Sequence, residues 1–215
     1  CLWGNRADLS HTETWEAVPS GEATRQERPY ILVDDTQHVQ ALLAAGVERV
    51  DVVTDNDGRE LLFDLALADY LLQQSWARLV RFHLKASPFF VSDAMVADAR
   101  RLLAAISAAP LGRRLAEHLA AGRLALADDP FWTTYLGFRH LPAALAADLS
   151  GAGLVILKGD VNYRRLLDDR HWPHTARLAD IAAYFPAPFL ALRTVKAELM
   201  VDLRPGQAEQ LAAED

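Results

Sequence analysis

Residues 49–60 constrain the fold more than any other stretch, because they combine an apolar strand, a polar turn and the start of a helix. The three valines of this stretch are β-branched and suit a strand that is buried on both faces. After Gly58 the apolar residues recur at helical spacing. Asp55 and Asn56 therefore fall at the carboxyl end of a strand and just before a helix, where open α/β sheets bind their ligands.

Strands and helices are predicted to alternate along most of the chain. Short apolar runs bounded by turn residues indicate strands, and segments with helical periodicity follow them. This order predicts an α/β fold, with a doubly wound, largely parallel sheet and helices on both faces, as in a Rossmann-like three-layer sandwich. The tail after Pro205 is polar and is expected to fray. The expected strands are 29–34, 50–53, 78–85, 124–126, 153–160 and 189–192, and the expected helices are 39–46, 61–71, 95–106, 110–122 and 141–149.

Composition excludes several classes of protein. The formal net charge of −7 argues against a nucleic-acid-binding surface. The lone Cys1 excludes an internal disulfide, and no apolar run reaches the ~18 residues that a membrane helix needs. No signal-peptide pattern opens the chain, so a soluble cytoplasmic protein without a membrane partner is expected. The length suits a single domain over 1–215, and the start without Met suggests a preceding segment. The sequence leaves the oligomeric state open.

Four of the predicted strands are followed by polar side chains. Because the carboxyl ends of parallel strands lie on one edge of a sheet, these side chains can converge on one crevice. Carboxylate and amide oxygens suit a hard cation such as Mg²⁺ or Mn²⁺, and Lys and Arg suit an anion. Together they are the groups that phosphoryl chemistry requires. The four sets are Asp55 with Asn56; Ser92 with Asp93; Lys158, Asp160, Asn162 and Arg164; and Arg193, Thr194 and Lys196.

Simpler interpretations of these residues remain open. Asp55 and Asn56 also suit a turn with a helix N-cap, and Ser92 or Asp93 could cap the following helix. Asp35, or the threonine after it, is expected to cap the helix over 39–46. No Gly-rich dinucleotide fingerprint follows a strand, and no spaced His pair or EF-hand pattern occurs, so nucleotide-cofactor, zinc and calcium-loop chemistry are not indicated.

Five short motifs occur in a fixed order. They are Leu-Trp-Gly-Asn-Arg-Ala-Asp-Leu-Ser at 2–10, Asp-Asn-Asp-Gly-Arg-Glu-Leu at 55–61, Phe-Val-Ser-Asp at 90–93, Lys-Gly-Asp-Val-Asn-Tyr-Arg at 158–164 and Arg-Thr-Val-Lys at 193–196. Together they resemble the damage-control phosphatase family, in its branch with the Arg-Thr-x-Lys motif. Proteins of that branch have also been called protein-glutamate methyltransferases. The resemblance covers nearly the whole chain.

The resemblance implies a metal-dependent phosphatase that acts on sugar phosphates such as fructose 1-phosphate or fructose 6-phosphate, in a metabolite damage-control role. The metal, Mn²⁺, Co²⁺, Ni²⁺ or Mg²⁺, would be held by Asp55, Asn56 and Asp93. Water activated at the metal, or Asp55 itself, would attack phosphorus, and Asp160 would act as an acid/base or hydroxyl ligand. The catalytic residues implied are Asp55, Asp93 and Asp160, and the substrate-binding residues are Asn5, Asp8, Glu60, Lys158, Asp160, Asn162, Tyr163, Arg164, Arg193 and Lys196, with Lys196 on the phosphate.

The chain departs from the family in two respects. Asp57 stands where family members commonly have Ala, and the domain is expected to lack the helical domain that usually precedes the first motif. Two rival functions follow. A protein-glutamate O-methyltransferase would bind S-adenosylmethionine tightly, although the Gly-rich turn is missing. A catalytically weak sugar-phosphate-binding module would be stabilised by ligand without releasing phosphate.

Overall fold

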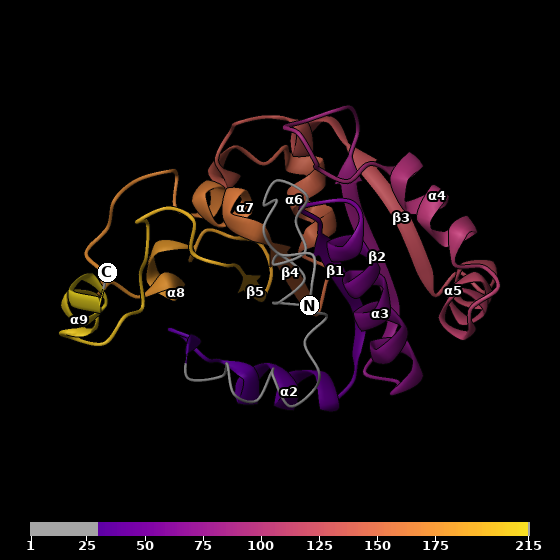
Figure 1. Cartoon of the computed structure of the whole chain (residues 1–215), viewed down its shortest axis with the longest axis horizontal. Helices are drawn as coiled ribbons and strands as arrows, with labels where there is room; N and C mark the ends of the chain where they lie inside the picture. The colour runs from indigo at the N-terminus through magenta and orange to yellow at the C-terminus, as the bar shows by residue number, and fades with distance from the viewer. Residues whose placement is uncertain (1–29, 215) are drawn as a thin grey trace.

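The computed structural model describes residues 30–214. Its centre is a five-stranded sheet in the order β3-β2-β1-β4-β5, with every neighbouring pair parallel (Figure 1). The expected α/β fold with a parallel sheet is therefore confirmed. The strands are β1 (Val47–Val53), β2 (Ala77–Lys85), β3 (Leu124–Asp129), β4 (Leu154–Lys158) and β5 (Phe189–Leu192). The helices are α2 (Thr36–Ala44), α3 (Arg59–Gln73), α4 (Val96–Ala105), α5 (Pro110–Ala120), α6 (Ala143–Leu149), α7 (Gly159–Leu166), α8 (Leu178–Ile181) and α9 (Gln207–Glu214), with 3₁₀ turns η3 (Pro130–Thr133) and η4 (Phe138–His140).

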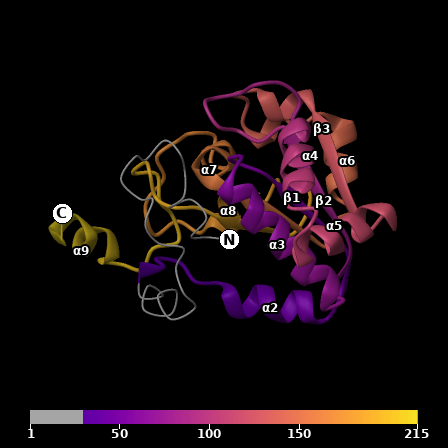
Figure 2. The same ribbon diagram turned by 45° about the vertical axis from the view of Figure 1, so that its right-hand side comes forward.

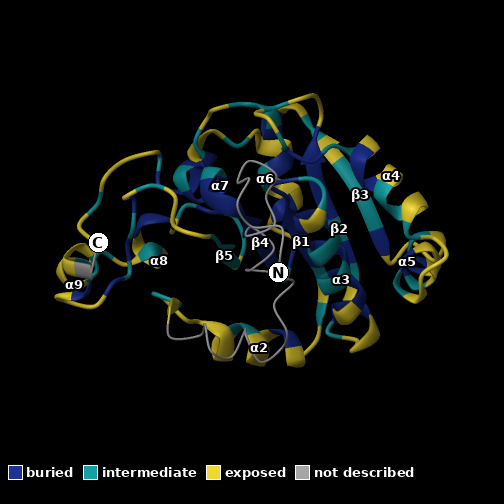
Figure 3. Ribbon diagram, viewed as in Figure 1, coloured by how far each residue is buried: buried dark blue, intermediate teal, exposed yellow. Residues whose placement is uncertain are grey.

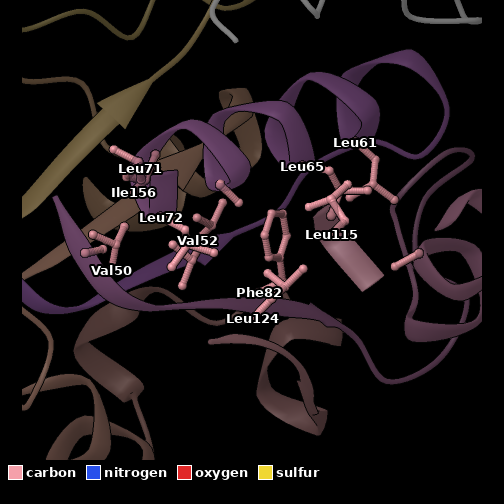
Figure 4. Packing of buried hydrophobic residues seen from close by; sticks show 14 of the residues in the cluster. Val50, Val52, Leu61, Leu65, Leu71, Leu72, Phe82, Leu115, Leu124 and Ile156 are labelled. Atoms are coloured by element: carbon pink, nitrogen blue, oxygen red, sulfur yellow. The ribbon is translucent and has the colours of Figure 1, made fainter. Parts of the chain in front are cut away.

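Two hydrophobic clusters cover the two faces of the sheet. On one face Val52 and Phe82 pack against Leu61 and Leu65 of α3, as Figure 4 shows, and α4 and α5 extend this cluster. On the other face Val53 and its neighbours pack against residues of η3, η4 and α6. Because successive side chains of a strand point to opposite faces, the apolar run of β1 supplies both clusters. This is the burial on two faces that the β-branched sequence predicts.

The expected strand over 29–34 is wrong where the structure describes it, since residues 30–35 form irregular chain that leads into α2. Tyr30 and Val33 are exposed, and none of the five described strands pairs with this segment. The tail after Pro205, which is expected to fray, contains α9 after one short turn.

The predicted helix caps are mostly replaced by neighbours. Thr36 N–H donates to the Asp34 carboxylate at 3.0 Å, so α2 is not capped by the side chain of Asp35. At α4 the N-cap is Met95, whose N–H donates to Asp98 at 2.9 Å. The N-cap of α3 is Gly58, so the side chains that follow β1 and β2 do not cap the helices that come after them.

The peripheral helices lie away from the centre of the sheet. In both views α2 and α9 lie at the border of the molecule (Figures 1 and 2), and both are largely exposed, whereas β4 and the carboxyl-terminal half of β1 are buried (Figure 3). Within residues 30–214 no helix has the length and apolar character needed to cross a membrane. The assignment of 1–215 to a single domain stays a prediction.

Candidate active site

The candidate site begins where β1 ends. Asp55 and Asn56 follow the strand, Glu60 lies in the first turn of α3, and all three side chains are buried. The Asn56 amide nitrogen donates to Asp55 Oδ2 at 3.1 Å and to Glu60 Oε2 at 3.0 Å. Gly58 has a φ of +72°, a conformation that glycine adopts without strain, and this turn brings Glu60 back towards the strand end.

The loop after β2 closes the site from the opposite side. Asn56 and Asp93 form an isolated antiparallel β-bridge, and the Ala94 N–H donates to the Asp55 carbonyl at 2.8 Å. Ser92 Oγ donates to Asn56 Oδ1 at 2.6 Å. Backbone bonds therefore fix the loop that carries Asp93 against the end of β1, and the three expected cation ligands are brought together.

A lysine from β4 completes one side of the cluster. Lys158 is the last residue of the strand and is buried. Its ammonium lies 2.8 Å from Glu60 Oε1 and 2.8 Å from Asp64 Oδ1. Burial opposes the charged form, but the two carboxylates hold the pKa of Lys158 above its ordinary value. Lys158 therefore fixes the position of Glu60 rather than facing an open crevice.

A second lysine, from β2, lies on the other side. Lys85 is the last residue of β2 and is 2% exposed. Its ammonium lies 3.1 Å from Asp93 Oδ2 and donates to the Thr54 carbonyl at a long 3.4 Å. The Asp93 contact is an ion pair without the angle of a hydrogen bond, since Oδ2 has no hydrogen-bond partner. The sequence interpretation did not single out Lys85.

The buried cluster carries more negative than positive charge. Among residues 30–214 it holds the carboxylates of Asp55, Glu60, Asp64 and Asp93, and the ammonium groups in direct contact with this set are those of Lys85 and Lys158. Burial, together with the nearby Glu60 and Asp93 carboxylates, raises the pKa of Asp55 to about 7. Burial also raises the pKa of Asp93, which the Lys85 ammonium only partly offsets. A divalent cation would balance this excess.

The described residues fit such a cation. Gly159, at the start of α7, has a φ of +82°, and a Cβ there would lie 1.9 Å from Asp55 Oδ2. The Asp55 carboxylate therefore occupies the space that a side chain at position 159 would need. Asp93 Oδ2 is buried without a hydrogen bond, so it keeps a lone pair for a ligand. Within residues 30–214 no three His, Cys, Asp or Glu side chains form a metal site, and the expected set has an amide as its third ligand.

An arginine and an aspartate lie on the β5 side of the site. Arg193 and Asp160 are 2.9 Å apart between NH2 and Oδ1, and both are largely buried. The Arg193 guanidinium also stacks over the Tyr163 ring at 4.3 Å and donates to two carbonyls of the segment after β5. Asn162 donates to the Thr54 and Lys158 carbonyls at 3.2 and 2.7 Å. Asn162 thus joins the ends of β1 and β4, and Tyr163 supports Arg193.

Some expected substrate residues lie elsewhere. Arg164 pairs with Asp169 at 2.7 Å on a partly exposed side of α7. Its neighbour Arg165 is buried instead, stacks over the Phe131 ring at 4.7 Å, and donates to two carbonyls of the chain after β3. Lys196 is exposed. Asn5 and Asp8 lie outside the described residues.

A large groove lies beside the cluster but does not contain it. Its volume is about 1540 Å³, and its lining includes Tyr163 and Arg193 together with apolar residues of α2, β4 and β5. None of Asp55, Glu60 and Asp93 is among its described lining residues. The groove and the candidate site are therefore two different places. The groove is mainly apolar, and the candidate site consists of buried charged groups.

Comparison with known proteins gives the family. Residues 1–211 match the family model described as the damage-control phosphatase ARMT1-like domain. The chain belongs to this family. It is 37% identical over 241 residues to damage-control phosphatase ARMT1 of Mus musculus, 34% over 242 residues to that of Homo sapiens and 35% over 236 residues to that of Danio rerio. Each alignment covers 100% of this chain and 53% of the relative.

The chain thus spans about half the length of the curated relatives it matches. Among solved structures it is similar to a DUF89 family protein from Pyrococcus horikoshii, with a TM-score of 0.48 and 18% sequence identity, over 88% of this chain and 57% of that one. This similarity is too low to bear on function. Family membership therefore rests on the sequence matches.

Proposed function

We propose that residues 1–215 form the catalytic α/β domain of a metal-dependent phosphatase that hydrolyses sugar phosphates of the fructose 1-phosphate or fructose 6-phosphate type. The observation that carries the proposal is the buried cluster at the end of β1, whose excess negative charge suits a divalent cation in a chain of this family. The same proposal includes a role in metabolite damage control and a cytoplasmic location. It also includes Mn²⁺, Co²⁺, Ni²⁺ or Mg²⁺ as the metal.

The proposed roles follow the placement of the side chains. Asp55, Asn56 and Asp93 hold the cation, which supplies charge neutralisation at the phosphoryl group when bound. Asn56 also keeps Asp55 and Glu60 together, since its amide nitrogen donates to both. A water molecule displaces the sugar oxygen at phosphorus, and the products are the free sugar and inorganic phosphate.

The β5 side is proposed to bind the sugar phosphate outside the cation site. Asp160 is held by Arg193 and is placed to accept a hydrogen bond from a sugar hydroxyl or to exchange a proton with the leaving oxygen. Arg193 and Lys196 provide positive charge for the anionic substrate. The remaining expected substrate residues are Asn5, Asp8, Glu60, Lys158, Asn162, Tyr163 and Arg164.

The test is phosphate release from a panel of sugar phosphates. The protein is first treated with EDTA, and Mn²⁺, Co²⁺, Ni²⁺ or Mg²⁺ is then restored in separate reactions. Release that appears only with metal, and that is absent from Asp55→Ala, supports the proposal. Absence of release with every metal contradicts it. If a sugar phosphate still raised the melting temperature, the chain would be a binding module instead.

A further inference from the structure

The lysines of this chain are few, and each lies at or after the carboxyl end of a strand. Of its 22 Lys and Arg residues only three are lysines, Lys85, Lys158 and Lys196. Lys85 and Lys158 are the last residues of β2 and β4, and Lys196 follows β5. Elsewhere the chain uses arginine. A compact ammonium binds phosphate as a point charge, whereas the planar guanidinium needs more space, so these positions are where the smaller cation matters.

The two buried lysines differ in how fully their donors are used. An ammonium has three donors. That of Lys158 lies 2.8 Å from each of two carboxylates, Glu60 and Asp64. That of Lys85 has the long bond to the Thr54 carbonyl and the ion pair with Asp93, and it has no further partner within residues 30–214. A buried ammonium with unused donors is costly unless a ligand accepts from it.

The position of Lys85 is set by the backbone around it. Its N–H donates to the Ala94 carbonyl at 2.9 Å, and it forms a parallel bridge with Met95. This holds the base of the side chain against the loop that carries Asp93. The ammonium therefore lies beside Asp93, one of the three expected cation ligands, and the loop that carries Asp93 is bonded to Asp55 through the Ala94 N–H.

We propose that Lys85 is a phosphate-binding catalytic residue, whose ammonium donates to a phosphoryl oxygen of a substrate held at the cation. The proposal rests on the proposed function and adds a residue that it did not include. The ligand class is a phosphate monoester or inorganic phosphate. Lys85 and the cation share the charge of the phosphoryl group, and Lys158 stays bound to Glu60 and Asp64.

The test compares metal and phosphate affinity in one variant. Lys85→Met keeps the side-chain length and removes the charge. Mn²⁺ binding is measured by calorimetric titration, and binding of inorganic phosphate is then measured on the Mn²⁺-loaded protein. We expect phosphate affinity to fall at least about tenfold, because one charged donor is lost. Mn²⁺ affinity should stay equal or rise, because a positive charge beside Asp93 is removed.

The two opposite changes separate this role from structural damage. Lys85→Met with unchanged phosphate affinity, or with Mn²⁺ and phosphate affinity falling together, overturns the proposal. Arg78→Met is the matched control, since Arg78 is an exposed cation at the other end of β2, and both affinities should remain those of wild type. A wild-type protein that binds phosphate but hydrolyses no sugar phosphate would contradict the proposed function. The phosphate affinities of wild type and Lys85→Met would then still decide whether Lys85 binds phosphate.

Discussion

Two lysines flank the end of β1, and the sheet holds them in different ways. On the β4 side the Lys158 ammonium is enclosed by two carboxylates at 2.8 Å. On the β2 side Lys85 is equally buried, yet it has one carboxylate at 3.1 Å without hydrogen-bond geometry. The two ammonium groups are equally buried, but they differ in the number of carboxylates that they contact and in the geometry of these contacts. We call Lys158 with Glu60 and Asp64 the closed side, and Lys85 with Asp93 the open side. The ion pairs of the closed side hold the cluster together, and the open side is where we propose that the cation and the phosphate bind.

The largest effect is expected from the proposed cation ligands, compared with the carboxylates that hold Lys158. Asp55→Ala removes a proposed cation ligand and should lower metal-dependent phosphate release at least about 1000-fold, the equivalent of about 4 kcal/mol. Asp64→Asn on the closed side should lower it by less than about tenfold, because the amide still accepts from Lys158. Rates are measured at saturating metal, with circular dichroism as the check on folding. Equal losses in the two variants would remove the distinction between the sides.

The closed side should dominate the stability of the metal-free protein. Lys158→Met leaves two buried carboxylates without their cation, and we expect the free energy of unfolding to fall by about 3–5 kcal/mol. Lys85→Met should cost about 1–2 kcal/mol, because fewer hydrogen bonds are lost. Urea unfolding in EDTA measures both. A loss for Lys85→Met as large as that for Lys158→Met would show that both lysines are structural.

The excess charge of the cluster should appear in the pH dependence of stability. The folded pKa of Asp55 is about 7, above its ordinary value of 3.8, so the folded state binds this proton more tightly than the unfolded state does. The contribution of Asp55 to stability is therefore full below about pH 4 and declines as the pH rises to about 7. Without metal, Asp55→Asn should be more stable than wild type at pH 8, by about 1–3 kcal/mol.

Urea unfolding at pH 4, 6 and 8 in EDTA measures this difference. Mn²⁺ should restore stability at pH 8 in the wild type and not in Asp55→Asn, because the variant lacks the ligand. Parallel pH profiles for the two proteins in EDTA would show that Asp55 ionises freely in the folded state, which would contradict the account of the cluster.

A smaller effect is expected from the serine that orients the amide. Ser92→Ala removes the 2.6 Å bond from Ser92 Oγ to Asn56 Oδ1. Mn²⁺ affinity should weaken about three- to tenfold, or about 1 kcal/mol. Ser107→Ala is the control, because Ser107 Oγ donates to the Ala104 carbonyl at the end of α4 and not to a residue of the candidate site. Titration of both variants with Mn²⁺ gives the result, and equal affinities would show that Asn56 needs no such support.

The sequence predicts the fold and the core of the site because both follow local rules. The β-branched run of β1 and the helical spacing after Gly58 place Asp55 and Asn56 at the carboxyl edge. The parallel topology then predicts that Asp93 comes to the same place, and the structure brings the three side chains together. These inferences require only that the sheet is parallel, and they do not require the order of its strands.

Other residues depend on facts that no local pattern carries. In the sequence Lys85 is the polar residue at the end of an alternating strand. It is buried because the loop after β2 folds back over it. Arg164 and Arg165 are adjacent, but successive helical residues point about 100° apart, so one is buried and the other pairs with Asp169. A motif match cannot show which of the two faces inward. The rarity of lysine was the available signal for Lys85.

The most direct test of the central claim is the stoichiometry of Mn²⁺ binding in two matched variants, measured by calorimetric titration at pH 8. Asp93→Asn removes a carboxylate from the open side, and Asp64→Asn removes one from the closed side, with the same change of charge and size. The account predicts one Mn²⁺ per chain in the wild type and in Asp64→Asn, and none in Asp93→Asn. Undiminished binding in Asp93→Asn would contradict it.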